Sequence, residues 1–302
     1  MIFTQFKSLP QFLDHFKDEQ TCKDYFESIR YKDGLFCAHC GNEKVHRFKN
    51  GKRFRCYSCK KDFTLKTGTI FGESRVSFRQ WFIAIYLLTT CKKGISSVEL
   101  AEKVGVTQKT AWFMDHRLRE AMKQDTEKLS GEIEADEKYV GGREKNKHYN
   151  KRNRTGKRLK TPIVGFLQRK GSVRAHVVQD VSLWTIEELV YRNINRDTML
   201  FTDEFSSYNR LKERYAHETV NHSRGEYKRG LAHTNSIESF WALFQRGYMG
   251  TYHQMSKKHL QRYVDEFCYR FNRRDRDVGE VFADAVHKVS VNGTLRYKVL
   301  IA

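Results

Sequence analysis

Two stretches near the beginning of the chain place apolar residues at every third or fourth position, which is the period of an amphipathic helix. The first stretch, residues 1–30, carries Phe6, Leu9, Phe12, Leu13 and Phe16. The second, residues 77–124, begins with Phe78, Trp81, Phe82, Ile85 and Leu88. We therefore expect an N-terminal helical segment that packs on the ribbon predicted for residues 31–66, and a second helical region whose stripe forms core.

Beyond residue 130 the pattern changes, and short apolar runs alternate with helical stretches. The runs at residues 131–136, 161–167, 172–178 and 199–203 predict strands, and Gly171 marks a hairpin turn between the second and the third. Helical spacing returns at residues 185–194, 234–249 and 256–272, and no internal repeat is found. This alternation predicts a second domain, of the α/β type, from about residue 130 onward.

Four cysteines occur in two pairs of the form C-x2-C, Cys37 with Cys40 and Cys56 with Cys59. Each pair offers two thiolates from one turn, and four thiolates complete the tetrahedral shell of one structural Zn²⁺ ion. Between the pairs, Asn50-Gly51 suits the central positions of a type I′ hairpin turn, because both residues tolerate positive φ. Residues 31–66 therefore read as a zinc ribbon, and its many Lys and Arg residues suggest contact with nucleic acid.

A helix-turn-helix pattern lies within residues 77–124. Ser96 or Ser97 can cap one helix, Gly105 suits the tight turn, and Thr107 can cap the next helix. Gln108 and Lys109 would then reach base edges or phosphates from the start of the second helix. A helical hairpin without a DNA-binding role fits the same short pattern.

Composition narrows the class of partner. The chain has 302 residues, a net charge of +20 and a pI near 9.6, and a basic excess of this size attracts polyanions. A basic protein without a nucleic-acid role remains the alternative.

Hydrophobic residues make up 39% of the chain, enough for two or three cores, yet no run reaches the length of a membrane span. No signal-peptide pattern opens the chain, and cysteines in zinc spacing suit a reducing compartment, so we expect a cytoplasmic, nucleoid-associated protein.

A basic tract runs from Arg143 to Lys160, with nine Lys or Arg residues and one Glu. This tract reads as an inserted arm that binds phosphates, or equally as a solvated linker.

Three carboxylates stand out in the second domain. Asp136 and Asp203 lie at or near the ends of predicted strands, where α/β sheets bind their ligands. Glu238 lies on a predicted helix beside the apolar stripe of Ile237, Phe240, Trp241 and Phe244, so that this helix can present it at the rim of the sheet. Carboxylate oxygens are ligands that Mg²⁺ prefers, and two such ions can promote phosphodiester cleavage.

Taken together, these motifs resemble the zinc-ribbon insertion-sequence transposases of the DDE type (ISXO-like). The resemblance implies an α+β multidomain protein with an α/β, ribonuclease H-like catalytic domain that has a mixed sheet, over residues 130–290. The resemblance spans nearly the whole chain and rests on the four cysteines, EADEKYVGGR at 134–143, TDEFSSY at 202–208, HTNSIESFW at 233–241, GTYH at 250–253, KHL at 258–260 and EF at 266–267.

The resemblance implies that Asp136, Asp203 and Glu238 hold two Mg²⁺ or Mn²⁺ ions and are catalytic. Thirty-four residues separate Asp203 from Glu238, close to the spacing of the family. Some relatives have Asn in the third place, so Asn235 is the alternative ligand. A basic residue often follows the third acid by one or two turns, and here Gln245 stands at the seventh position, which leaves Arg246 as the candidate phosphate contact.

His233 and Asn235 are candidates for supporting roles around the metal ligands. By this resemblance the protein binds the terminal inverted repeats of a mobile element, cleaves the strand at its end, and joins the freed 3′-hydroxyl to target DNA, as a dimer or a higher assembly.

Two other functions fit the sequence. A DNA-binding regulator would use the ribbon and the helix-turn-helix with a non-catalytic second domain. A metal-dependent nuclease would cut DNA without joining it.

Overall fold

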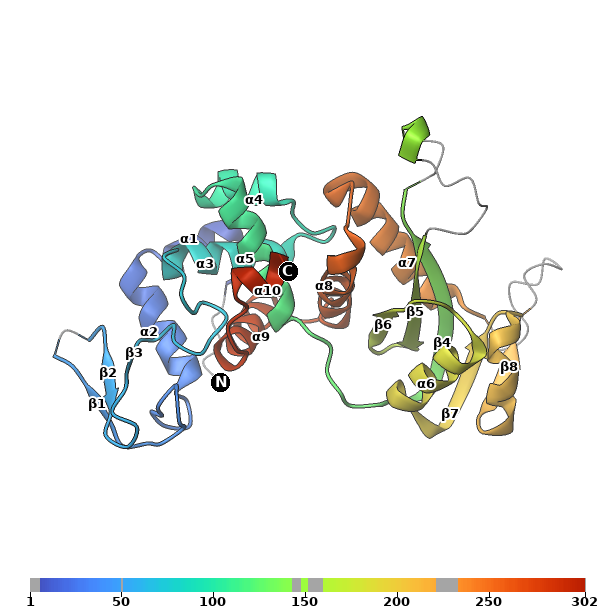
Figure 1. The fold of residues 1–302 in the computed structure, drawn as a ribbon, viewed down its shortest axis with the longest axis horizontal. Coiled ribbons are helices and arrows are strands. Elements are labelled where there is room, and N and C mark those ends of the chain that lie inside the picture. Colours follow the sequence, from blue (N-terminus) through green and yellow to red (C-terminus); the bar gives the residue numbers. More distant parts are fainter. Residues whose placement is uncertain (1–5, 50, 143–147, 152–159, 221–232, 302) are drawn as a thin grey trace. The chain divides into compact units, whose positions relative to one another are not determined.

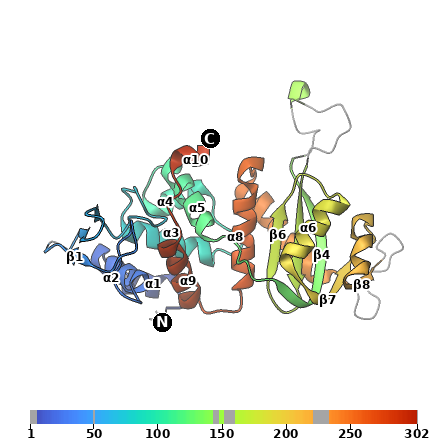
Figure 2. The same cartoon turned by 60° about the horizontal axis from the view of Figure 1, so that its bottom comes forward.

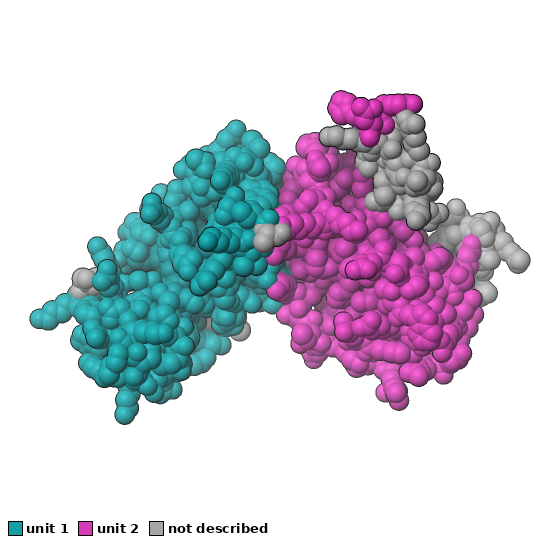
Figure 3. Space-filling view, viewed as in Figure 1, with its two compact units in different colours: residues 1–122, 275–302 teal, residues 123–274 magenta. Residues whose placement is uncertain are grey.

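The computed structural model describes residues 6–49, 51–142, 148–151, 160–220 and 233–301. It divides the chain into two compact units (Figure 3), residues 1–122 with 275–302 and residues 123–274. The second unit thus ends before the predicted boundary at residue 290, because helix α9 (Val278–Val291) packs on α2, α3 and α5 of the first unit. Most of the basic tract lies outside the described residues. Among the described residues, no helix is long and apolar enough to cross a membrane.

The first unit is built around aromatic side chains from helices that are far apart in sequence. The predicted N-terminal segment forms α1 (Leu9–His15) and α2 (Glu19–Arg30), and the predicted stripe lies on α3 (Phe78–Thr90). Phe12 of α1 packs against Tyr86 of α3 and Phe282 of α9, with ring centroids 4.4 and 5.3 Å apart. α1 therefore packs mainly on α3 and α9, with Leu9 exposed. The predicted contact of the N-terminal segment with the ribbon is made by α2, where Glu27 pairs with Arg47.

The zinc ribbon consists of three short antiparallel strands, β1 (Val45–Arg47), β2 (Phe54–Cys56) and β3 (Asp62–Phe63). The predicted hairpin turn is present, but a hydrogen bond of 2.8 Å from Gly51 N to Phe48 O closes it. Gly51, at φ +65°, therefore occupies the fourth position of the turn and not the predicted central position, while Asn50 lies outside the described residues. Buried Arg30 donates hydrogen bonds to Leu65 O and, at 2.6 Å, Thr67 O, and these bonds connect the end of the ribbon to α2.

The helix-turn-helix forms with the predicted end residues. Ser96 caps α4 (Ser97–Val104), Gly105 follows it at φ +71°, and the side chain of Thr107 accepts from Thr110 N at the start of α5 (Gln108–Ala121). Most of α5 is buried from Met114 onward. Only its first turn is therefore open for contact with a ligand. A short helix, α10 (Tyr297–Ile301), brings the Tyr297 ring 5.3 Å from that of Phe113 on α5.

The second unit contains a mixed five-stranded sheet in the order β6-β5-β4-β7-β8 (Figures 1 and 2). Its strands are β4 (Leu129–Val140), β5 (Thr161–Gln168), β6 (Val173–Val177), β7 (Ile194–Thr202) and β8 (Ala216–Thr219). β4, β5 and β6 are antiparallel neighbours, whereas β7 is parallel to β4 and β8 is parallel to β7. This is the mixed sheet expected of a ribonuclease H-like domain, with β8 as a strand that the sequence analysis missed.

Helices cover both faces of the sheet. α7 (Asn235–Gly247) and α8 (Leu260–Asn272) pack through Ile237, Trp241 and Phe267 against one face. α6 (Leu183–Asn193) and the 3-10 helix Ser206–Glu213 pack on the other face, over Ala135 and Leu200. A π-helix (Tyr248–Tyr252) and a 3-10 turn (Lys257–His259) connect α7 to α8.

Side chains complete the hydrogen bonding of the edge strand β6. Asn272 of α8 accepts from Val173 N at 2.7 Å and donates to Val173 O at 3.0 Å. Gln261 accepts from Val177 N at 2.7 Å, and Gln124 accepts from Ala175 N at 2.9 Å. The amide groups thereby take the place of a further strand, which protects the edge from pairing with another chain.

Candidate active site and metal centre

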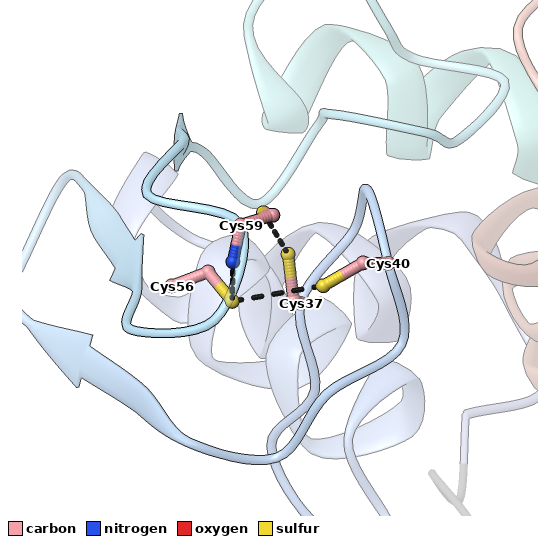
Figure 4. Close-up of side chains that lie close together, drawn as sticks. All are labelled: Cys37, Cys40, Cys56 and Cys59. Carbon is pink, nitrogen blue, oxygen red and sulfur yellow. Dashed lines mark hydrogen bonds between the residues drawn. The ribbon is translucent and has the colours of Figure 1, made fainter.

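The four cysteines of the ribbon gather their sulfur atoms in one place (Figure 4). Cys37 Sγ lies 3.7 Å from Cys59 Sγ, and Cys40 Sγ lies 3.7 Å from Cys56 Sγ. Four sulfurs at the usual Zn–S distance of about 2.3 Å from a tetrahedral centre stand about 3.8 Å apart. The thiol positions therefore fit one structural Zn²⁺, as the spacing predicted.

Backbone N–H groups support these thiolates. Cys59 N donates to Cys56 Sγ at 3.5 Å, and His39 N donates to Cys37 Sγ at 3.3 Å. The bond from Cys59 N is the main reason why the pKa of Cys56 is lowered to about 7. A lowered thiol pKa favours the thiolate, the form that binds zinc, at Cys56. The hydrogen bond from Asn42 N lowers the pKa of the neighbouring Cys40, but burial and the other three sulfurs outweigh it and raise that pKa to about 11.

In the second unit, β4 and β7 bring Asp136 and Asp203 to the same level of the sheet. The parallel ladder between these strands pairs Glu134 with Phe201, and each aspartate lies two residues further along its own strand. Asp203 directly follows β7, as predicted, whereas Asp136 lies inside β4 and not near its end. β4 continues beyond Asp136 because it stays paired with β5, so the site forms where β7 alone ends.

Glu238 reaches the same region from the first turn of α7. Its Oε1 accepts a hydrogen bond of 3.0 Å from Thr234 Oγ1, at the residue before the helix. Burial and the Asp203 carboxylate are the main causes that raise the pKa of Asp136, and the Glu238 carboxylate adds a smaller effect. Asn235, the alternative ligand, lies one turn earlier on α7, and both side chains are exposed. Which of the two is the third ligand stays a prediction.

Burial and mutual repulsion shift the acids toward their neutral forms. The pKa of Asp136 is raised to about 6, first by burial and then by the Asp203 carboxylate. Glu137 follows on the opposite face of β4, and burial followed by the charge of Asp203 raises its pKa to about 7. Tyr208, fully buried, donates a hydrogen bond of 3.1 Å to Glu137 Oε2. A group of acids that repel one another in this way is the environment that a cation stabilises.

The donor set suits a hard divalent cation. All three side chains offer carboxylate oxygens, which Mg²⁺ and Mn²⁺ prefer over nitrogen or sulfur. Among the described residues, only the four cysteines place three or more possible ligand atoms within 4.8 Å of one another. The three acids are more widely spaced than that, and a pair of ions about 4 Å apart does not require every ligand to touch every other.

A glycine allows α7 to lie close to the sheet beside Asp136. Gly165 of β5 pairs with Asp136, and directly paired residues of an antiparallel ladder face the same side. A Cβ atom on Gly165 would lie 2.6 Å from Trp241 Cζ2 and 3.1 Å from Ile237 Cδ1. The absence of a side chain at this position therefore brings the helix of Glu238 down onto the strand of Asp136.

Sequence reasoning missed one acid that is central to this region. Glu134, two residues before Asp136, is fully buried and contacts Arg169 and the first residues of α7. The signal for it was the period of two along a strand, which puts residues 134 and 136 on the same face. His233, predicted to have a supporting role, lies in this group, with Nδ1 3.2 Å from Glu134 Oε1.

The predicted DNA contacts occupy separate places. Gln108 is exposed, and its Nε2 donates to Ser97 Oγ at 2.9 Å. Exposed Lys109 lies over the Tyr297 ring, 5.4 Å from its centroid. Arg246 is exposed near the C-terminal end of α7, two turns beyond Glu238. Gln108 and Lys109 belong to the first unit and Arg246 to the second.

Comparison with known proteins identifies the family. A transposase zinc-ribbon domain matches residues 17–62, and an ISXO2-like transposase domain matches residues 128–272. The chain therefore belongs to the insertion-sequence transposases with these two domains. The resemblance stated from the cysteine and acid motifs is confirmed.

Two relatives and two solved structures are similar to the chain. A protein in transposable element ISH50 of Halobacterium salinarum is 28% identical over 272 residues, which cover 84% of this chain and 91% of that protein. A transposase-like protein of Haemophilus influenzae is 27% identical over 107 residues, covering 35% of this chain and 85% of that one. The Mos1 strand transfer complex aligns over 69% of this chain and 74% of its own, with 13% identity and a TM-score of 0.30. A Mos1 paired-end complex with the left transposon end aligns over 69% and 75%, with 14% identity and a TM-score of 0.28.

Proposed function

We propose that the protein is a DNA transposase that binds the terminal inverted repeats of an insertion sequence, hydrolyses the strand at the element end and transfers that end to target DNA. The observation that carries this proposal is the level placement of Asp136 and Asp203 on adjacent parallel strands, with Glu238 in electrostatic contact from α7. In a transposase family, acids from two strands and one helix supply the ligands that metal-dependent phosphodiester chemistry needs.

The three acids that would hold the cations come from three different elements. Asp136 is held inside β4, Asp203 directly follows the end of β7, and Glu238 lies on the first turn of α7. Two Mg²⁺ or Mn²⁺ ions bound there would activate the attacking oxygen and stabilise the leaving oxygen of an in-line displacement. No covalent protein nucleophile is needed, because water and then the freed 3′-hydroxyl are the attacking groups. Holding both DNA ends beside the acids supplies much of the remaining rate.

DNA recognition is assigned to the first unit. The basic ribbon and the exposed first turn of α5, with Gln108 and Lys109, would bind the element end, and Arg246 of the second unit would contact a phosphate near the acids. The two ends must be held together for joining, so a dimer or a higher assembly of the chain is part of the proposal.

A strand-transfer assay tests the proposal. Labelled element-end DNA, taken from the sequence that flanks the gene, is incubated with plasmid target and Mg²⁺. The wild type is compared with Asp203→Ala and with a matched control, Asp197→Ala, which removes an exposed acid from the same strand. We expect cleavage and joining by the wild type and the control, and neither by Asp203→Ala, while all three bind the end.

Other outcomes identify the alternatives. Tight binding without any cut by the wild type would contradict the proposal and favour a DNA-binding regulator. Metal-dependent cutting that never yields a joined product would favour a nuclease.

A further inference from the structure

The carboxylate of Glu134 is fully buried on β4, yet it contacts five groups outside its own strand. One of them is the His233 ring, whose Nδ1 lies 3.2 Å from Glu134 Oε1. Its Oε2 accepts from Ser236 N at 2.8 Å and from Ile237 N at 3.0 Å. Its Oε1 accepts from Ser236 Oγ at 3.0 Å and from Arg169 Nε at 2.9 Å. Both backbone donors belong to the first turn of α7, where N–H groups lack partners within the helix.

Arg169 balances the buried charge and connects it to β7 and to the segment just before α7. Beyond Glu134, its guanidinium donates to His233 O at 3.0 Å, just before α7, and to Glu132 Oε2 at 3.1 Å. The guanidinium also lies 3.9 Å from the centre of the Phe201 ring on β7. A buried carboxylate with a paired cation and several donors is stable, whereas the removal of one partner leaves an uncompensated group.

These contacts lie close to the three acids along the chain. Glu134 and Phe201 are paired across the β4–β7 ladder, and Asp136 and Asp203 each follow two residues later. On the helix side, the two bonded amides belong to Ser236 and Ile237, and the next residue is Glu238. Short stretches of rigid backbone therefore separate the contact from Asp136 at one end and from Glu238 at the other.

We infer that Glu134 is a positioning residue, which sets the place of Glu238 relative to Asp136 by holding the first turn of α7 on β4. This inference rests on the proposed metal-binding role of the three acids. Glu134 does not itself serve as a metal ligand, since both of its oxygens are already used by α7 and Arg169. Removal of its charge loosens the helix start, and the third acid then meets the cations less often in the right position.

Glu134→Gln is the test variant, because it keeps the volume and replaces one accepting oxygen with a donor that cannot pair with N–H groups. Glu132→Gln is the matched control. Glu132 contacts the same arginine from the same strand, but its side chain is 47% exposed. Within the described residues it makes no hydrogen bond to α7. Ser236→Ala is the milder second variant, since it removes only the hydroxyl bond and leaves the backbone donors in place.

Two measurements on the full chain, without DNA, read the effect directly. Hydrogen exchange of the Ser236 and Ile237 amides is expected to speed up at least about tenfold in Glu134→Gln, the factor that a loss of about 1.4 kcal/mol gives. Calorimetric Mn²⁺ titration is expected to show affinity weakened by about 10-fold or more, the usual effect of losing a group that orients a metal ligand. Ser236→Ala should shift both in the same direction, with Mn²⁺ affinity about threefold weaker, and Glu132→Gln should match the wild type.

The results separate this inference from the proposed function. Wild-type exchange and Mn²⁺ affinity in a folded Glu134→Gln variant would overturn the positioning role, whatever the cleavage assay gives. If Glu134→Gln does not fold, unchanged exchange and affinity in Ser236→Ala would overturn it instead. A wild type that binds Mn²⁺ at the acids but never cuts DNA would contradict the transposase proposal and leave the positioning role standing.

Discussion

Asp136 and Asp203 stand side by side on the sheet because each lies two residues beyond the paired residues Glu134 and Phe201 of parallel strands. β7 ends at Thr202, so Asp203 is the first residue free of the strand, while β4 continues along β5. One acid is thus held rigidly within a strand, and its neighbour sits at the start of a turn, where Asp203 Oδ1 accepts from Phe205 N at 3.0 Å. The pair is preformed by strand register and does not depend on loop closure.

Asp136→Asn should stabilise the metal-free protein at neutral and higher pH. The pKa of Asp136 is raised from 3.8 to about 6 in the folded state, mainly by burial and then by Asp203. As the pH rises from about 4 to about 6 the unfolded chain ionises this group more readily, so folding loses stability in that window, and the loss stays constant above it. Because the Asp136 side chain is only partly buried, only part of this pKa shift counts toward stability. We expect the free energy of unfolding of Asp136→Asn to exceed that of the wild type by about 1–2 kcal/mol at pH 8, and the difference to fall toward zero at pH 4.

Urea unfolding of the wild type and the variant, with chelator and then with Mg²⁺, measures this gain. Mg²⁺ should stabilise the wild type and reverse the order of the two proteins, since the variant lacks a ligand. Asp197→Asn is the control, an exposed acid on β7. Equal stability of the wild type and Asp136→Asn at both pH values would show that Asp136 is not strained by its neighbours.

Local signals in the sequence were enough for much of the fold. The ends of the two helices of the helix-turn-helix were predicted closely, with Ser96 or Ser97 left open as the first cap, because Ser96, Gly105 and Thr107 act through their own backbone neighbours. The end of the second unit was not predictable in this way. α9 looks like any amphipathic helix in sequence, and tertiary contacts assign it to the first unit, among them those of the Phe282 ring with Phe6, Phe12 and Phe16.

The candidate site was predicted in part, because its three acids stand in local sequence motifs. Asp136, Asp203 and Glu238 stand in recognisable motifs, and the structure brings the first two level and Glu238 into electrostatic contact with Asp136. Their role as ligands stays a prediction. Arg169 could not be found from the sequence, because its importance comes from contacts with strands and a helix that are distant along the chain. Pairing across a sheet is a tertiary property, and single residues do not signal it.

Gly165→Ala should weaken both stability and catalysis. The new Cβ would meet Trp241 Cζ2 at 2.6 Å, so α7 must move away from β5 and carry Glu238 with it. Overpacking of this kind costs about 1–3 kcal/mol, which urea unfolding measures, and the half-saturating Mn²⁺ concentration for cleavage should rise. Gly250→Ala is the stability control, because nothing lies within 4 Å of its added Cβ. A Gly165→Ala protein as stable as Gly250→Ala would mean that α7 does not press on the sheet as described.

Lys109→Ala should weaken binding of DNA ends and reduce its salt dependence. The side chain is exposed at the first turn of α5, and its ammonium group lies over the Tyr297 ring. It forms no ion pair with another described residue. Loss of one phosphate contact lowers the slope of log affinity against log salt by about 1. Lys103 on α4 is the control, since it pairs with Glu99 at 2.9 Å and its charge is already balanced. Equal slopes for the wild type and Lys109→Ala, measured by fluorescence anisotropy at several salt concentrations, would remove Lys109 from the interface.

Loss of the zinc ion should disorder the ribbon and leave the aromatic core of the first unit folded. The strands β1 to β3 are two or three residues long, and one stacked pair of rings, Phe54 and Phe63, packs between β2 and β3, so we expect the four thiolates to hold most of the ribbon together. Cys59→Ser should therefore release about one equivalent of zinc, as measured by a colorimetric chelator. Hydrogen exchange should rise across residues 37–63 and stay low in α3 and α9. Cys91→Ser, at the end of α3 and outside the cluster, is the control and should keep its zinc. Unfolding of α3 and α9 together with the ribbon would show instead that the metal supports the whole unit. Weaker DNA-end binding by Cys59→Ser would then reflect the loss of global stability and not the loss of ribbon contacts.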